Sequence, residues 1–176
     1  MTLFRNKFRV ESTRLPHLDY TEQGVYFVTI CVGDRKCLFG SVENSEVKLS
    51  VLGEFVNDCW EQIPSHHDGV RIHDYVVMPN HLHGLVELEP SPLPYIERRS
   101  PKAGSLGAII RSFKGAVTKW ARENAFLDFA WQARYYDHVV RNYNSLTQIQ
   151  EYIRYNPANW LFDSSNPAVR QYYRET

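Results

Sequence analysis

The chain has 176 residues, of which 43% are hydrophobic and 23% charged, and this suits one folded domain with a buried core. These values exclude a disordered tail and a collagen-like fibre. Lys and Arg equal Asp and Glu at 20 each, so the net charge is zero. The apolar runs are shorter than the roughly 18 residues of a membrane helix, and we expect no membrane span.

The cysteines and the start of the chain bear on its compartment. Cys31, Cys37 and Cys59 show no C-x-x-C pairing, and residues 1–7 lack the apolar stretch of a signal peptide. We therefore expect a reduced cytoplasmic protein with free thiols, folded as a single domain over residues 1–176.

Charge is distributed unevenly along the chain. Residues 1–90 hold 8 Lys and Arg against 13 Asp and Glu, whereas residues 91–176 hold 12 against 7. The basic excess is densest in 91–122, where seven cations face only Glu97. Such a segment can bind a polyanion, or it can be an ordinary solvated face. If it binds nucleic acid, the candidate phosphate contacts are Arg98, Arg99, Lys102, Arg111 and Lys114.

The first elements are two strands and a helix. Residues 26–32 are rich in β-branched and aromatic side chains and predict a buried strand, with which a short strand at 47–49 would pair. Ser50 is a suitable cap for a helix with apolar residues at helical spacing, and Pro64 marks its expected end.

A hairpin and a long helix follow. Residues 74–78 and 81–88 predict paired strands around a Pro-Asn turn, and residues 89–104 predict a loop. The clearest helix spans 105–124, because its apolar residues form one face while Arg111 and Lys114 fall on another, largely basic side.

The last elements complete the fold class. Residues 135–140 predict a further strand, and Ser145–Gln148 has the sequence of a capping box for a final helix that Pro157 ends. Hairpins joined to helices indicate an α+β domain with an antiparallel sheet that carries helices on one face.

His81 and His83 are the first candidate site residues. Side chains two apart on a strand share a face, with Cα atoms about 6.6 Å apart, so the two imidazoles can bind one divalent ion. The spacing alone also fits a pair of surface or core histidines without a metal.

Tyr152 and Asn156 are the second candidates, one turn apart on the final helix and beside its apolar face. From the residues alone, a tyrosine at the edge of the core is the alternative. Tyr155 points further from the buried face and is the weaker choice for a reactive tyrosine.

The chain resembles a known family along about residues 14–160. The family is the single-tyrosine transposases with a histidine–hydrophobe–histidine (HUH) motif, in the form of REP-associated tyrosine transposases. The similar segments, in order, are YFVTIC at 26–31, MPNHLHG at 78–84, GSLGAIIR at 104–111, FK at 113–114, WQ at 131–132, YYDH at 135–138, RN at 141–142 and EYIRYNP at 151–157.

The resemblance implies a ferredoxin-like HUH-endonuclease fold and a DNA transposase. In such enzymes Mg²⁺ or Mn²⁺ is held by residues that match His81, His83 and Asn156, and the residue that matches Tyr152 attacks single-stranded DNA. The attack gives a 5′-phosphotyrosine and a 3′-OH, at hairpin-forming REP-like palindromes. The resemblance also implies a homodimer.

Two other functions compete with this interpretation. A Zn²⁺ hydrolase would use His81 and His83 with a third histidine such as His73, and would leave Tyr152 without a role. A non-catalytic module would hold single-stranded nucleic acid through the basic helix and the aromatic residues.

Overall fold

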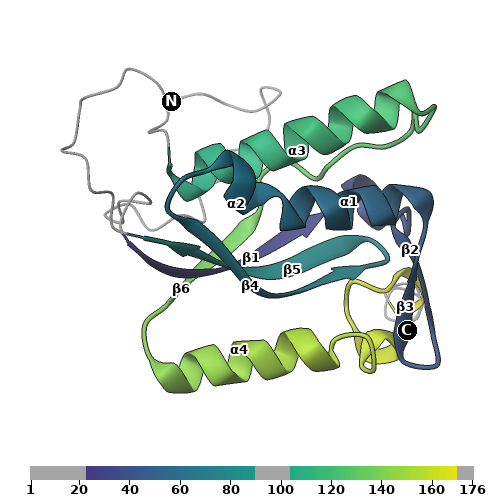
Figure 1. Ribbon diagram of the computed structural model, residues 1–176. Coiled ribbons are helices and arrows are strands. Elements are labelled where there is room, and N and C mark those ends of the chain that lie inside the picture. The colour runs from purple at the N-terminus through teal and green to yellow at the C-terminus, as the bar shows by residue number, and fades with distance from the viewer. Residues whose placement is uncertain (1–22, 90–103, 170–176) are drawn as a thin grey trace, which may run out of the picture.

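Four antiparallel strands form the central sheet, in the order β4-β5-β1-β6 (Figure 1). The computed structural model describes residues 23–89 and 104–169. Backbone hydrogen bonds pair β5 with β4 on one side and with β1 on the other, so β5 is an inner strand of the sheet. The strand bounds are β1 Gly24–Cys31, β4 Val70–Met78, β5 His81–Leu88 and β6 Tyr136–Val140.

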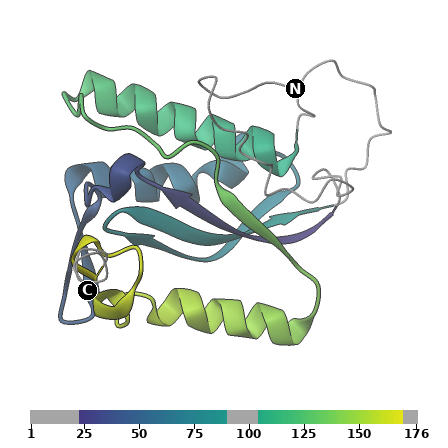
Figure 2. The same ribbon diagram turned by 180° about the vertical axis from the view of Figure 1, so that it is seen from behind.

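Helices cover both faces of this sheet, not one. The helices α1 (Val51–Glu61) and α3 (Leu106–Glu123) lie on one side, and α4 (Tyr143–Tyr155) lies on the other (Figures 1 and 2). The reason is visible in β5, whose residues are buried on both of its faces, so each face needs a covering layer. The α+β antiparallel class is confirmed, and the single-sided arrangement is corrected.

The face under α1 and α3 contains the larger apolar cluster. Trp60 of α1 is fully buried and meets Phe113 of α3 edge to face, with ring centroids 5.2 Å apart. A Cβ on Gly84 of β5 would lie 2.5 Å from the Trp60 ring, so this strand position needs glycine for the close approach. The expected apolar face of α3 is confirmed at Leu106, Ile109, Ile110, Phe113 and Val117.

The predicted helix caps are partly confirmed. The Ser50 side chain accepts a hydrogen bond from the Gly53 N–H and caps α1 as expected. The last helix begins at Tyr143, because the Asn142 side chain accepts from the Ser145 N–H at 2.8 Å. The predicted start at Ser145 is therefore wrong by one short turn, while the end before Pro157 is confirmed.

Two short elements differ from the prediction. The strand β3 (Glu46–Leu49) pairs with β2 (Gly40–Glu43) in a separate two-stranded sheet, and not with β1. Pro64 lies in the first turn of α2 (Ile63–His66), where a proline is tolerated because its missing N–H has no helical partner. Two one-turn 3-10 helices complete the description: η1 (Gly33–Arg35) and η2 (Trp160–Phe162).

The predicted loop at 89–104 lies almost wholly outside the described residues. In the described part of the chain, no helix has both the length and the apolar character needed to cross a membrane.

Candidate functional site

His81 and His83 lie side by side on the α4 face of β5. Their ring centroids are 4.5 Å apart, and both side chains are buried. Their neighbours in the strand, Leu82 and Val86, point into the core under α1 and α3. The two-residue spacing has the effect expected in a strand. The imidazoles lie on one face, and the packed apolar side chains lie on the other.

Asn80 fixes the orientation of His81. The Asn80 Nδ2 group donates to the Arg35 carbonyl at 2.9 Å and to the Ser165 carbonyl at 2.8 Å. Of the two ends of the Asn80 amide, only the NH₂ group can donate to these carbonyls. The other end, Oδ1, therefore accepts the 2.8 Å hydrogen bond from His81 Nδ1–H. The lone pair of His81 is therefore on Nε2.

His83 is held in a similar way from β1. Its Nδ1 lies 2.8 Å from Thr29 Oγ1, and its Nε2 lies 3.2 Å from the hydroxyl of Tyr152 on α4. We assign the tautomer in which Nδ1–H donates to Thr29, which lets the Tyr152 hydroxyl donate to Nε2. Phe27 stacks on the His83 ring at 5.4 Å and meets Tyr152 edge to face at 6.1 Å.

The surroundings keep both histidines neutral. Burial lowers the pKa of His81 to about 3, and the charge of Arg35 acts in the same direction. Burial lowers the pKa of His83 well below its usual value, helped by His81 and Arg35 and opposed by Asp163. Neutral imidazoles are the form that binds metal ions.

Asn156 follows Tyr152 by one turn at the end of α4 and is 3% exposed. Burial and the nearby Asp163 raise the pKa of Tyr152, whereas a hydrogen bond with the Asn156 side chain lowers it. Tyr152 thus connects Asn156 to His83. Tyr152 as a whole is 49% exposed, unlike the buried His83 and Asn156.

Two buried polar atoms of this site have no hydrogen-bond partner among the described residues: His81 Nε2 and Asn156 Oδ1. A third such atom, Trp60 Nε1, belongs to the opposite core. Buried polar groups nearly always have partners, so two unpaired acceptors at one site mark a position for another group. Two imidazole nitrogens and an amide oxygen together suit a divalent cation.

His73 does not belong to this site. Its Nε2 lies 2.7 Å from Glu87 Oε2, and Glu87 is four residues beyond His83 on β5, or about 13 Å along the strand. Within residues 23–89 and 104–169, no cluster of three His, Cys, Asp or Glu side chains is placed to hold a metal ion. The zinc site with His73 as third ligand is therefore wrong.

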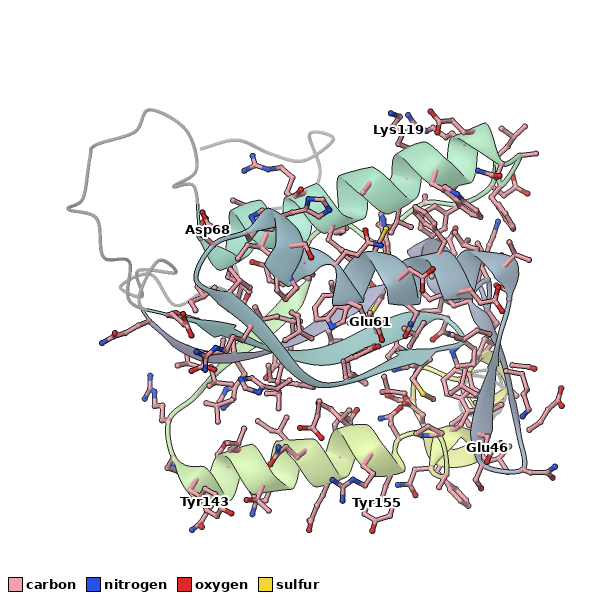
Figure 3. The ribbon with its side chains drawn as sticks, viewed as in Figure 1. Glu46, Glu61, Asp68, Lys119, Tyr143 and Tyr155 are labelled. Carbon is pink, nitrogen blue, oxygen red and sulfur yellow. The ribbon has the colours of Figure 1, made fainter. Side chains whose placement is uncertain are left out.

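The expected DNA contacts are not brought together with the histidines. Arg98, Arg99 and Lys102 lie outside the described residues. Arg111 is exposed on α3, across the sheet from Tyr152, as the labelled positions of Lys119 and Tyr155 illustrate (Figure 3).

Lys114 of α3 hydrogen-bonds to backbone carbonyls in this structure. Its ammonium donates to the carbonyls of Gln132 and Arg134, each at 2.9 Å, and lies 5.7 Å from the centre of the Trp131 ring. Burial lowers its pKa. The side chain thus anchors the segment that leads into β6.

A groove of about 770 Å³ runs along α3 beside that segment. Its lining is largely apolar by surface area, but it includes five cations, Arg111, Lys114, Lys119, Arg122 and Arg134, with Glu123 as the acidic member. The predicted basic side of α3 therefore forms a surface feature on the face opposite the histidines.

Sequence reasoning missed the residues that support the site: Phe27, Thr29, Arg35, Asn80 and Ser165. Asn80 lies in the predicted turn and in the MPNHLHG segment, but neither predicts that it orients His81. The others come from distant segments, and only the pairing of β1 with β5 and the fold of residues 160–166 bring them to the histidines.

Comparisons with known proteins find relatives in sequence and in fold. No protein-family model matches the chain. A Haemophilus influenzae protein described as uncharacterized is 42% identical over 162 residues, which are 86% of this chain and 90% of that protein. A second H. influenzae protein, named "Putative REP-associated tyrosine transposase", is 26% identical over 146 residues, or 79% of this chain and 73% of that protein.

One solved structure shares the fold. It is a REP-associated tyrosine transposase bound to a REP hairpin, and it matches with a TM-score of 0.58 at 16% sequence identity. The match covers 85% of this chain and 74% of the other. The four-stranded antiparallel sheet with its helices is therefore the fold of that protein.

Proposed function

We propose that this chain is a REP-associated tyrosine transposase, that is, a metal-dependent single-strand DNA endonuclease and strand transferase with Tyr152 as nucleophile. One observation carries the proposal. The Tyr152 hydroxyl lies 3.2 Å from His83 Nε2, in a site where His81 Nε2 and Asn156 Oδ1 are buried without partners.

The metal site would consist of His81, His83 and Asn156. The amide oxygen suits Mg²⁺ or Mn²⁺, and imidazole nitrogens bind divalent transition metals such as Mn²⁺. The hydrogen bonds to Asn80 and Thr29 orient the two imidazoles; His81 Nε2 has no partner, and an ion at His83 Nε2 would replace the hydrogen bond from the Tyr152 hydroxyl. When bound, such an ion would orient a DNA phosphate and neutralise its charge.

Tyr152 supplies the attacking oxygen. A bond forms between its Oη and phosphorus while the bond from phosphorus to the 3′-oxygen breaks, which leaves a 5′-phosphotyrosine and a 3′-OH. The hydroxyl proton of Tyr152 ends on the departing 3′-oxygen, so the phosphodiester charge is conserved. A second 3′-OH then reverses the reaction and transfers the strand without an external energy source.

The DNA is proposed to be a hairpin with single-stranded arms. Support comes from the related transposase, whose structure contains a REP hairpin, and from the basic groove along α3, which suits a phosphate backbone. Arg111 is the described member of the expected contact set whose side chain is exposed in this groove.

A covalent-adduct assay tests the function. The probe is a pool of labelled DNA hairpins with random single-stranded arms, incubated with the full chain and Mn²⁺ and analysed on a denaturing gel. We expect a protein–DNA band that requires Mn²⁺ and is absent in Tyr152→Phe. Because only a hydroxyl is lost, the free energy of unfolding should change by about 1 kcal/mol or less.

Tyr155→Phe is the matched control, since Tyr155 lies on the same helix and is 57% exposed. It should form the adduct like the wild type. A wild-type protein that binds the hairpins but forms no adduct, or an adduct that survives in Tyr152→Phe, contradicts the proposed mechanism.

A further inference from the structure

Tyr136 is an exposed aromatic residue in the same row of paired strand positions as His83 of the proposed active site. It lies on the edge strand β6 and pairs with Thr29 of β1, which in turn pairs with His83 of β5. Directly paired residues of antiparallel strands share a face, so Tyr136 is on the α4 side of the sheet. Its side chain is 53% exposed, so the ring is accessible to a ligand.

Phe27 connects Tyr136 to the reactive residues. The ring centroids of Phe27 and Tyr136 are 6.3 Å apart, in an edge-to-face contact. The same Phe27 stacks on His83 and contacts Tyr152. One continuous aromatic cluster therefore extends from the edge of the sheet to the nucleophile.

The packing of α4 leaves this side of the face accessible. Among the strands, α4 contacts β4 most extensively, and β4 is the edge opposite β6. A DNA strand that reaches the half-exposed Tyr152 can thus lie across β1 and β6. Two strand spacings separate His83 from Tyr136, or about 10 Å. That distance equals about three steps of a stacked strand at 3.4 Å each, and fewer if the strand is extended.

The groove along α3 meets the same edge. Its lining includes Arg134 and Tyr135, the two residues immediately before Tyr136. Phosphates held in the basic groove would therefore continue over β6 onto the aromatic side. Charge on one side of the edge and an aromatic ring on the other is the combination that suits single-stranded DNA.

We propose that Tyr136 stacks on a base of the single-stranded DNA flanking the scissile phosphate. The inference rests on the proposed function, because it names how the substrate strand is held at that site. Stacking on an aromatic ring contributes affinity without reading the sequence, since each base has a π-face. Loss of the ring should weaken strand binding between roughly fivefold and 150-fold.

The test separates bases from phosphates. Two labelled hairpin pools are used, one with random single-stranded arms and one whose arms have the same length and charge but are abasic. Binding of the full chain is measured by fluorescence anisotropy. We expect the wild type to prefer arms with bases, and Tyr136→Val to lose most of that preference while its affinity for abasic arms stays unchanged. Valine is chosen because it is well suited to a strand.

Two variants complete the design. Tyr136→Phe should restore the preference, because it keeps the ring, and Tyr143→Ala should retain it, because Tyr143 is exposed at the far end of α4 (Figure 3). If Tyr136→Val binds both pools as the wild type does, or weakens on both equally, the inference is overturned. A wild type that forms no adduct but shows the Tyr136-dependent preference contradicts the catalytic proposal alone.

Discussion

The two faces of the central sheet differ in what their buried residues do. Under α1 and α3, the buried side chains are almost entirely apolar and form the larger cluster, with Trp60 and Phe113 at its centre. Under α4, the fully buried apolar group is small and consists of Phe27, Leu85 and Ile153. Partly buried aliphatic side chains surround this group, and the same face carries the buried polar groups of the site, including two acceptors without partners.

A single strand serves both faces. In β5, Leu82 and Val86 pack into the larger core, while His81 and His83 between and beside them form the site. Stability thus comes mainly from one face, which allows the other to keep buried polar atoms that cost free energy in the free protein. The positions of the two imidazoles are therefore fixed by the packing of the opposite face of their strand.

The same substitution on the two faces should give the largest measurable difference in stability. Ile109 of α3 is fully buried in the larger core, whereas Ile149 of α4 is only partly buried. We expect Ile109→Ala to reduce the free energy of unfolding by about 2–5 kcal/mol and Ile149→Ala by less than about 2 kcal/mol. Urea denaturation measures both. Equal losses would show that α4 contributes as much to the core as α3.

Hydroxyl groups offer a matched pair for the metal site. Thr29 holds His83 through a 2.8 Å bond, and Thr118 of α3 donates to the Lys114 carbonyl at 2.7 Å on the other face. We expect Thr29→Val to weaken Mn²⁺ binding to the DNA-free protein roughly 10- to 100-fold, because the imidazole loses its orienting partner. Thr118→Val should leave it unchanged. Electron paramagnetic resonance of free Mn²⁺ measures the affinity, and equal effects of the two changes would contradict the assignment of His83 as a ligand.

Local patterns predicted much of this division. The two-residue spacing of the histidines in 81–88 correctly assigned both of them to one face of the strand. The 3.6-residue periodicity of 105–124 identified α3 and its buried side. Both signals arise within one element, so the sequence is sufficient to read them.

Relations between elements were harder to predict. Residues 47–49 have the sequence of a strand, which led to the prediction that they pair with β1. Their hairpin with β2 forms through a close turn, and nothing in residues 47–49 identifies β2 as the partner. The roles of Thr29 and Ser165 depend on contacts 54 and 85 residues away in the chain. The carbonyl partners of Lys114 are likewise 18 and 20 residues away, and charge alone does not predict them.

Acid should destabilise the metal-free protein through the α4 face. His81 and His83 have lowered pKa values in the folded state, so below about pH 6.5 the unfolded chain binds protons that the folded chain does not. Stability is therefore present above that pH and is lost as pH falls, by about 1.4 kcal/mol per pH unit for each histidine. For His81 the loss of stability continues until the pH reaches its folded-state pKa of about 3. Urea titrations in EDTA between pH 5 and 6.5 should show a shallower slope for His81→Gln. An unchanged slope would mean that His81 is protonated in the folded protein.

The smallest expected effect concerns the basic groove, and it separates two cations of the same helix. Arg111 is exposed in the groove, whereas the Lys114 ammonium is bound to two carbonyls. We expect Arg111→Gln to lower the slope of log affinity against log salt by about one, because one phosphate contact and its released counterion are lost. Lys114→Met should keep the slope but reduce the free energy of unfolding by about 1–3 kcal/mol, since two hydrogen bonds disappear. Hairpin binding at several salt concentrations and urea denaturation measure the two effects. If the salt slope falls for Lys114→Met and not for Arg111→Gln, Lys114 contacts a phosphate despite its two carbonyl partners, and the assignment of Arg111 as a phosphate contact is wrong.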